Sequence, residues 1–113
     1  MAGTLKRIFG PVALTNTLTT NVYNNSSALI YDSLKQILVT NKTAGAVTFT
    51  LYLGATGANA AGTELFTAVS IPANTTQPYY FSGLKLTSTD FLVGGASANT
   101  SLTITGMGEQ FVV

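Results

Sequence analysis

The most constraining feature of this sequence is a central pair of alternating segments within residues 36–54, QILVTNKTAGAVTFTLYLG. Ile37 and Val39 alternate with Leu38 and Thr40. From Val47 to Leu53, apolar residues alternate with Thr and Tyr in the same period of two. A period of two sends successive side chains to opposite sides of a β-strand. The break between the segments, residues 41–45, is polar and contains Asn and Gly. The pattern therefore predicts a β-hairpin with a long loop, whose apolar side needs a second sheet to cover it.

The rest of the chain repeats this pattern of short alternating segments. Turn signals rich in Asn, Ser, Gly, Pro or Asp separate the segments at intervals of about 8–12 residues, and no segment keeps a helical period. About seven to nine short strands in one 113-residue chain predict a single all-β domain spanning residues 1–113. The expected architecture is a two-sheet antiparallel sandwich with Greek-key or jelly-roll-like connections.

Several positions predict departures from regular strands. Residues 1–10 are followed by Pro11, which cannot donate to a sheet ladder, so they form either a bent first strand or an N-terminal arm that reaches a neighbouring subunit. The pair Asp32-Ser33 is expected to mark a bulge or turn, and Gly83 a bulge. Residues 106–108, Gly-Met-Gly, are expected to interrupt the last strand.

The charge content of the chain is unusually low. Only 8% of the residues are charged, compared with about 25% in a typical soluble domain, and Thr, Asn, Ser, Gly and Ala take their place. Such a surface suits a protein packed against neighbours, although a neutral, hydroxyl-rich surface also tolerates solvent. With a net charge of +1 and scattered basic residues, neither nucleic acid nor an anionic membrane is an expected partner. No signal peptide or membrane span is expected, because Gly, Pro, Asn and Thr break the uncharged stretches.

The sequence lacks the residues of common active sites. It has no His and no Cys, which removes the usual general base, the common zinc ligands and thiol nucleophiles. The four carboxylates are far apart in sequence, and each is expected at a turn or strand end as a solvated or capping group: Asp32, Glu64, Asp90 and Glu109. We therefore expect no enzyme activity, no metal site and no cofactor.

The aromatic residues leave two interpretations open. In the cluster Tyr79-Tyr80-Phe81, Tyr80 points to the side opposite its two neighbours if the segment is a strand. Tyr80 and Tyr52 are then candidates for an exposed platform that stacks on a glycan, although the chain has no Trp. Alternatively, Phe81 belongs to the core and the tyrosines lie at its border or at a subunit contact.

Segments spread over nearly the whole chain carry a family resemblance. They are Gly10-Pro11 with Leu14, Val22-Tyr23 before a turn, residues 37–54, SIPANTT at 70–76 and TSLTITGMGEQF at 100–111. Together they resemble small β-sandwich virion proteins of tailed bacteriophages. That group includes capsid decoration (cement) proteins and accessory proteins of the tail or the head–tail junction. The resemblance implies a structural protein assembled in multiple copies, and it offers no catalytic residues to transfer.

These observations lead to a hypothesis of function. The chain is expected to be a non-enzymatic phage virion protein, made in the host cytoplasm and located on the capsid surface as a decoration protein. It would form a trimer or higher homo-oligomer and pack against the major capsid protein. The alternatives are a tail or head–tail junction protein and a glycan-binding module. The residues expected to contact partners lie near the chain ends and in the long loop: Lys6, Arg7, Ile8, Phe9, Ala58, Asn59, Phe111 and Val113.

Two of these residues allow a direct test of the hypothesis. Replacing Phe9 or Phe111 with Ala is expected to weaken binding to particles more than it weakens folding.

Overall fold

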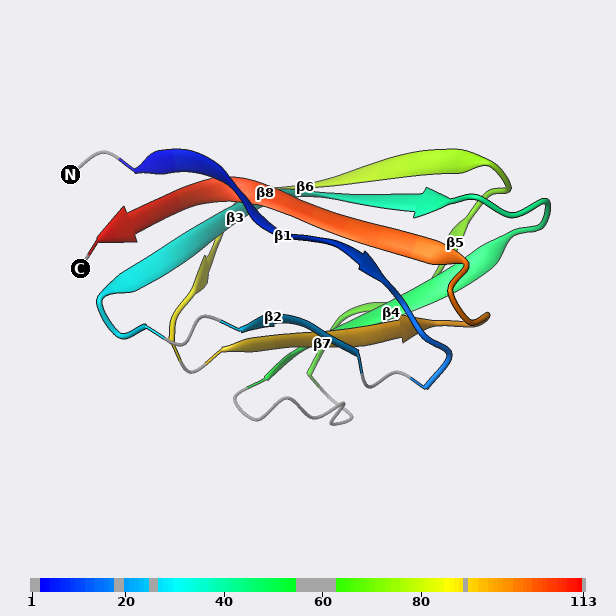
Figure 1. Cartoon of the computed structure of the whole chain (residues 1–113), viewed down its shortest axis with the longest axis horizontal. Coiled ribbons are helices and arrows are strands. Elements are labelled where there is room, and N and C mark those ends of the chain that lie inside the picture. Colours follow the sequence, from blue (N-terminus) through cyan, green and yellow to red (C-terminus); the bar gives the residue numbers. More distant parts are fainter. Residues whose placement is uncertain (1–2, 18–19, 25–26, 55–62, 89, 113) are drawn as a thin grey trace.

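The chain folds entirely into β-structure over the residues that the computed structural model describes, 3–17, 20–24, 27–54, 63–88 and 90–112. Within these residues there are eight strands: β1 (Thr4–Ala13), β2 (Thr20–Asn24), β3 (Ile30–Asn41), β4 (Val47–Gly54), β5 (Glu64–Ile71), β6 (Thr75–Leu86), β7 (Phe91–Ala96) and β8 (Leu102–Val112). They form two four-stranded antiparallel sheets packed face to face (Figure 1). The predicted two-sheet antiparallel sandwich is therefore confirmed.

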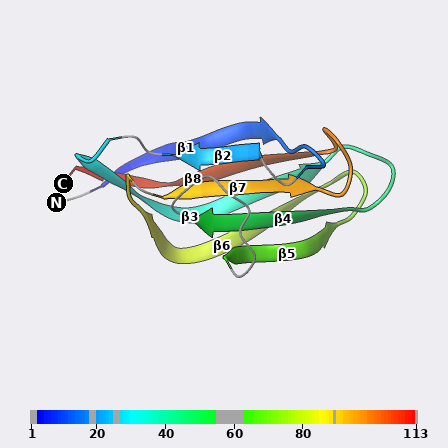
Figure 2. The same ribbon diagram turned by 90° about the horizontal axis from the view of Figure 1, so that it is seen from below.

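The order of the strands is that of a jelly roll. One sheet runs β1-β8-β3-β6 and the other runs β2-β7-β4-β5. Figure 2 shows the second sheet laid across the first, with β1 and β2 along one side and β5 and β6 along the other. Only β4 and β5 are neighbours in both the sequence and a sheet, so most connections carry the chain from one sheet to the other.

The predicted central hairpin is wrong. Residues 37–41 belong to β3 and residues 47–54 to β4, but β3 and β4 lie in different sheets. Both segments alternate as expected, and their inward side chains are buried: Ile37, Val39, Val47, Phe49 and Leu51. These side chains meet across the sandwich, so each strand covers the apolar side of the other instead of pairing with it edge to edge.

Asn41 organises the corner where the chain passes between the sheets. Its side chain is 1% exposed. The amide nitrogen Nδ2 donates to the carbonyl oxygens of Gly45 and Ile71, at 2.9 and 3.0 Å. The amide oxygen Oδ1 accepts from the backbone nitrogen and the hydroxyl of Thr43, at 2.9 and 2.7 Å. A single side chain therefore holds the β3–β4 corner in shape and ties it to the end of β5.

A polar cluster inside the sandwich links the two sheets. The hydroxyl of Tyr23, on β2, donates to Oδ2 of Asp32, on β3. The amide of Gln110, on β8, donates to the other carboxylate oxygen of Asp32 at 3.1 Å. Asp32 is 3% exposed and Tyr23 6%. The expectation that Asp32 is a solvated group at a turn is wrong, because this carboxylate lies within a strand and joins the sheets through its buried hydrogen bond with Tyr23.

Other predicted irregularities have mixed outcomes. Residues 4–10 belong to β1, which pairs with β8 and shifts register on both sides of Phe9, so they form a bent first strand; the second shift spans the cis Gly10-Pro11 peptide. The bulge at Gly83 is confirmed, because the β3–β6 register shifts there and Gly83 has φ of 132°. The β3 irregularity lies between Leu34 and Gln36, not at Asp32-Ser33.

The expected interruption of the last strand is also wrong. Residues 106–108 lie within β8, which is continuous from Leu102 to Val112. Gly106 is needed there for packing, because a Cβ at this position would lie 2.3 Å from the ring of Phe9. Glycine thus makes room for a core aromatic residue instead of ending the strand.

The four edge strands all carry irregularities. In the first sheet, β1 contains Pro11 and β6 contains Pro78. In the second sheet, β2 is only five residues long and shifts register after Asn21. The edge strand β5 shifts register twice against β4 and includes Ala68 with φ of 45°.

The link between the sheets can be tested with Tyr23→Phe. This substitution removes one of the two hydrogen-bond donors to the buried Asp32 carboxylate and should lower the free energy of unfolding at pH 7 by about 1–3 kcal/mol. Denaturant titration measures the change. Tyr80→Phe is the matched control, because the Tyr80 side chain is 74% exposed and the loss of its hydroxyl should change stability by less than about 0.5 kcal/mol. Equal stabilities of the two variants would contradict a structural role for the Tyr23 hydroxyl.

The same residue predicts alkaline sensitivity. Burial, followed by the hydrogen bond to Asp32 and the charges of Asp32 and Asp90, raises the pKa of Tyr23 above its ordinary value of 10.0. Above pH 10 the unfolded chain therefore releases this proton while the folded chain keeps it. The free energy of unfolding should fall by up to about 1.4 kcal/mol per pH unit from this residue, and below pH 10 this residue should cause no such fall. The free energy of unfolding, measured from about pH 8 to about pH 12 so that the range brackets the ordinary tyrosine pKa of 10.0, should fall less steeply with pH in Tyr23→Phe.

Candidate protein-interaction face

The outward side of the β1-β8-β3-β6 sheet gathers side chains from all four strands. Because cross-strand partners project to the same side, the register defines rows across this sheet. One row is Leu5–Glu109–Ser33–Lys85, from β1 to β6. A second row is Arg7–Met107–Gln36–Tyr80. A third pair, Tyr31–Phe111, lies at the end of the sheet where β1 begins and β8 ends (Figure 1).

We call this surface the aromatic–basic face and define it by nine residues. They are Leu5, Arg7, Tyr31, Lys35, Tyr80, Lys85, Met107, Glu109 and Phe111.

Ring stacking and charge pairing fix part of this face. The rings of Tyr31 and Phe111 stack with their centroids 4.9 Å apart and their planes 9° from parallel. The ammonium group of Lys85 lies 4.6 Å from the centre of the Tyr31 ring, in a cation–π arrangement. Lys35 forms an ion pair with Glu109 at 3.1 Å. These contacts connect β3, β6 and β8 and give the face a defined shape.

Large apolar groups on this face remain open to solvent. Leu5 is 82% exposed and Tyr80 is 74% exposed. Leu29 and Val112, near the same end of the sheet, are also exposed, at 70% and 59%. Exposed apolar residues scattered singly are ordinary, but two on one face, together with further aromatic rings and Arg, are typical of protein–protein contacts.

The charges of the chain are unevenly divided between the sheets. Four of the five basic residues lie on strands of the β1-β8-β3-β6 sheet: Lys6, Arg7, Lys35 and Lys85. Of the carboxylates on the same sheet, Asp32 is buried on its inner side and Glu109 pairs with Lys35. Glu64 begins β5 and Asp90 precedes β7, in the other sheet. The basic residues are thus scattered in the sequence but collected by the fold, and this face is net positive.

The predicted contact residues fall into three groups. Lys6 and Arg7 are exposed on β1, and Phe111 lies on the aromatic–basic face. Ile8 packs partly against the core. Ala58, Asn59 and Val113 lie outside the described residues.

Phe9 requires a correction. Its side chain is 8% exposed and its ring centre lies 6.3 Å from that of Tyr23, so it belongs to the core and not to a contact surface. The bend of β1 explains the error, because the register shift between Arg7 and Phe9 turns Phe9 inward.

The proposed glycan platform of Tyr52 and Tyr80 is also wrong. Tyr80 lies on β6, on the outward side of the first sheet. Tyr52 lies on β4, in the second sheet, and shares its parity with the outward residues Thr48 and Thr50. The two rings face away from each other on opposite sides of the sandwich and cannot hold one ligand.

The carboxylates occupy structural positions in the described part of the chain. Oδ2 of Asp90 accepts from the backbone nitrogen of Thr87 at 2.7 Å, which confirms the expected capping role. Asp32 lies inside the sandwich and Glu109 outside it, so these two do not face a common cleft. Among the described residues, His, Cys, Asp and Glu do not gather in groups of three or more. In the same part of the chain, no helix has the length and apolarity needed to cross a membrane.

Sequence comparison adds no relative. No model of a known protein family matches the chain, and no curated protein matches it significantly.

The revised position of Phe9 changes the expected result of its substitution. Phe9→Ala removes a core ring and should lower the free energy of unfolding by about 3–5 kcal/mol. Phe111→Ala removes a half-buried ring that stacks on Tyr31 and should cost only about 0.5–1.5 kcal/mol. Denaturant titration of both variants provides the comparison. A Phe9→Ala protein as stable as Phe111→Ala would show that the ring of Phe9 does not support the core.

Proposed function

We propose that this chain is a non-enzymatic structural protein of a bacteriophage particle, where it acts as a capsid decoration protein. The observation that carries the proposal is the aromatic–basic face, on which Leu5 and Tyr80 are largely exposed beside Arg7 and a stacked Tyr31–Phe111 pair. In this proposal the face docks on the major capsid protein. Tyr and Arg are enriched at the centres of such interfaces because they combine large contact area with hydrogen bonding.

The fold and the composition support the same proposal. Jelly rolls are frequent in viral capsid proteins, but they also occur in lectins and cupins, so the fold alone does not decide. The resemblance of the sequence to small virion proteins of tailed phages favours the viral assignment. A surface with few charges also suits a protein that is covered by partners for most of its life.

The size of the face is appropriate for this role. A specific interface buries about 1,200–2,000 Å² in total, or about 800 Å² on each partner. The aromatic–basic face extends over four strands with a spacing of about 4.8 Å, so it is wide enough to supply most of one side of such an interface. Its net positive charge favours an acidic surface on the capsid protein. Further contacts between copies of this chain, as a trimer or larger oligomer, would multiply the stabilisation over a shell.

A substitution on the face tests the docking. The double variant Leu5→Thr/Tyr80→Thr keeps good strand formers at both positions and removes two exposed apolar groups. It should fold with near-normal stability but bind purified particles at least about tenfold more weakly, since interface anchors are worth about 1–2 kcal/mol or more each. Tyr52→Thr, which removes a tyrosine from the opposite sheet, is the matched control and should bind normally. Normal particle binding by the double variant would contradict docking through this face.

The location of the protein separates the two virion assignments. Quantitative mass spectrometry of purified particles should find this chain in about the same order of copy number as the major capsid protein if it decorates the shell. A stoichiometry of only a handful or a dozen copies would assign it to the tail or the head–tail junction. Complete absence from particles would contradict both.

A further inference from the structure

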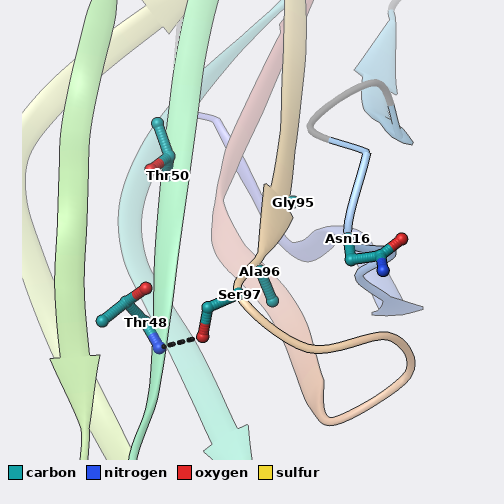
Figure 3. A pocket seen from close by; sticks show the side chains of 6 residues that line it. All are labelled: Asn16, Thr48, Thr50, Gly95, Ala96 and Ser97. Carbon is teal, nitrogen blue, oxygen red and sulfur yellow. Dashed lines mark hydrogen bonds between the residues drawn. The ribbon is translucent and has the colours of Figure 1, made fainter.

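The outward side of the second sheet carries a pocket with entirely neutral walls. It has a volume of about 320 Å³ and opens beside β4 and β7 (Figure 3). Its lining residues come from these two strands, from the start of the β7–β8 connection and from the β1–β2 connection: Asn16, Thr48, Thr50, Gly95, Ala96 and Ser97. Ligand pockets begin at about 300 Å³, so this pocket is of the size that suits one small ring.

Glycine keeps the floor of the pocket flat. Gly95 is the register partner of Thr50 and is buried. Because it has no side chain, the position between Thr50 and Asn16 stays open. The strands are also closely apposed here, because a Cβ added at the neighbouring Gly94 would lie 2.5 Å from the carbonyl oxygen of Thr50. The floor therefore consists of backbone and small groups, a surface on which a flat ligand can lie.

Backbone hydrogen bonds hold the walls in position. The nitrogen of Ala96 donates to the carbonyl oxygen of Thr15 at 2.8 Å, which fixes the connection that carries Asn16. The nitrogen of Ser97 donates to the carbonyl oxygen of Thr48 at 2.9 Å. In return, the nitrogen of Thr48 donates to the hydroxyl oxygen of Ser97 at 3.0 Å (Figure 3). The three segments around the pocket are thus tied together before any ligand binds.

Two wall hydroxyls each retain a hydrogen that they can donate. The hydroxyl oxygen of Thr50 accepts from the nitrogen of Ala68 at 3.0 Å, as that of Ser97 accepts from Thr48. A hydroxyl whose oxygen already accepts still has one hydrogen to donate. Ala68 reaches Thr50 with a left-handed φ of 45°, at the point where the β4–β5 register shifts. Such strained residues and bulges are concentrated next to functional sites.

We propose that this pocket binds a neutral saccharide ring. Sugars present several hydroxyls, each a donor and an acceptor, and the walls supply matching hydroxyls from Thr48, Thr50 and Ser97 and an amide from Asn16. The lining contains no ionisable group, so it offers no partner for a charged ligand. Tyr52 follows Thr50 by two residues on the same side of β4, and in this proposal its ring offers a neighbouring surface for sugar C–H groups.

This site is independent of the docking face proposed above. It lies on the other sheet, so docking through the aromatic–basic face does not itself cover it. The assignment also differs from the two-tyrosine platform excluded above, because it uses Tyr52 only as an extension of a hydroxyl-lined pocket.

Nuclear magnetic resonance titration of the full isotope-labelled chain tests the proposal. The probes are methyl glucoside, methyl galactoside and N-acetylglucosamine. At least one should bind with a dissociation constant of about 1–10 mM, as expected for one small ligand in a shallow site, and should shift amide signals of residues 48–50 and 95–97. Thr48→Val should weaken that binding by at least about threefold, the value of one hydrogen bond. Thr105→Val, a matched change on the outward side of the first sheet, should leave it unchanged.

Three results would overturn the assignment. They are the absence of binding by all three sugars, signal shifts confined to the first sheet, and equal or tighter binding of the charged analogues glucuronate and glucosamine. Particle binding does not enter any of these measurements, so the site stands or fails separately from the decoration role.

Discussion

The whole structure depends on two long alternating segments facing each other across a core. β3 and β4 are consecutive in the sequence and would each expose an apolar side if they paired as a hairpin. Placed in opposite sheets, they bury Ile37, Val39, Phe49 and Leu51 against one another. The Asn41 corner makes this arrangement possible, because three of its four hydrogen bonds satisfy backbone groups at the point where the chain leaves one sheet for the other. In the jelly-roll order, β8 and β6 pair on either side of β3, and β7 and β5 pair on either side of β4. The strands β1 and β2 then complete the sheets beside β8 and β7.

The sequence predicts the layers of this fold better than its connections. Alternation identifies the inward residues of β3 and β4, because a side-chain period of two is a local property. Pairing is not local: the same alternation fits a hairpin or two facing strands, and only the shape of the corner decides between them. Gly106 was misread for a related reason, since the ring of Phe9 that requires it comes from the other end of the chain.

The candidate faces were partly predictable. Arg7 and Phe111 are predicted as contact residues because they lie near the chain ends, and Tyr80 is predicted as an exposed ring. All three lie on one face. Lys85 and Tyr31 were not selected, because their contact depends on the register of β3 against β6. Phe9 was misplaced because a register shift reverses the inward side of β1 partway along its length. The neutral pocket had no sequence signal, since Thr, Ser and Asn are frequent throughout the chain.

The irregular edge strands have a consequence for the behaviour of this protein at high concentration. A neutral chain rich in strand-forming Thr and Val has little electrostatic repulsion to keep its copies from stacking into cross-β fibrils. Fibril growth needs a straight row of free amide and carbonyl groups along an outermost strand. Pro11, Pro78 and the left-handed Ala68 interrupt that row on three of the four edges, and the remaining edge is only five residues long. At high concentration, molecules are therefore expected to associate through the outer faces of their sheets, which gives assemblies of limited size. They are not expected to pair edge to edge into fibrils.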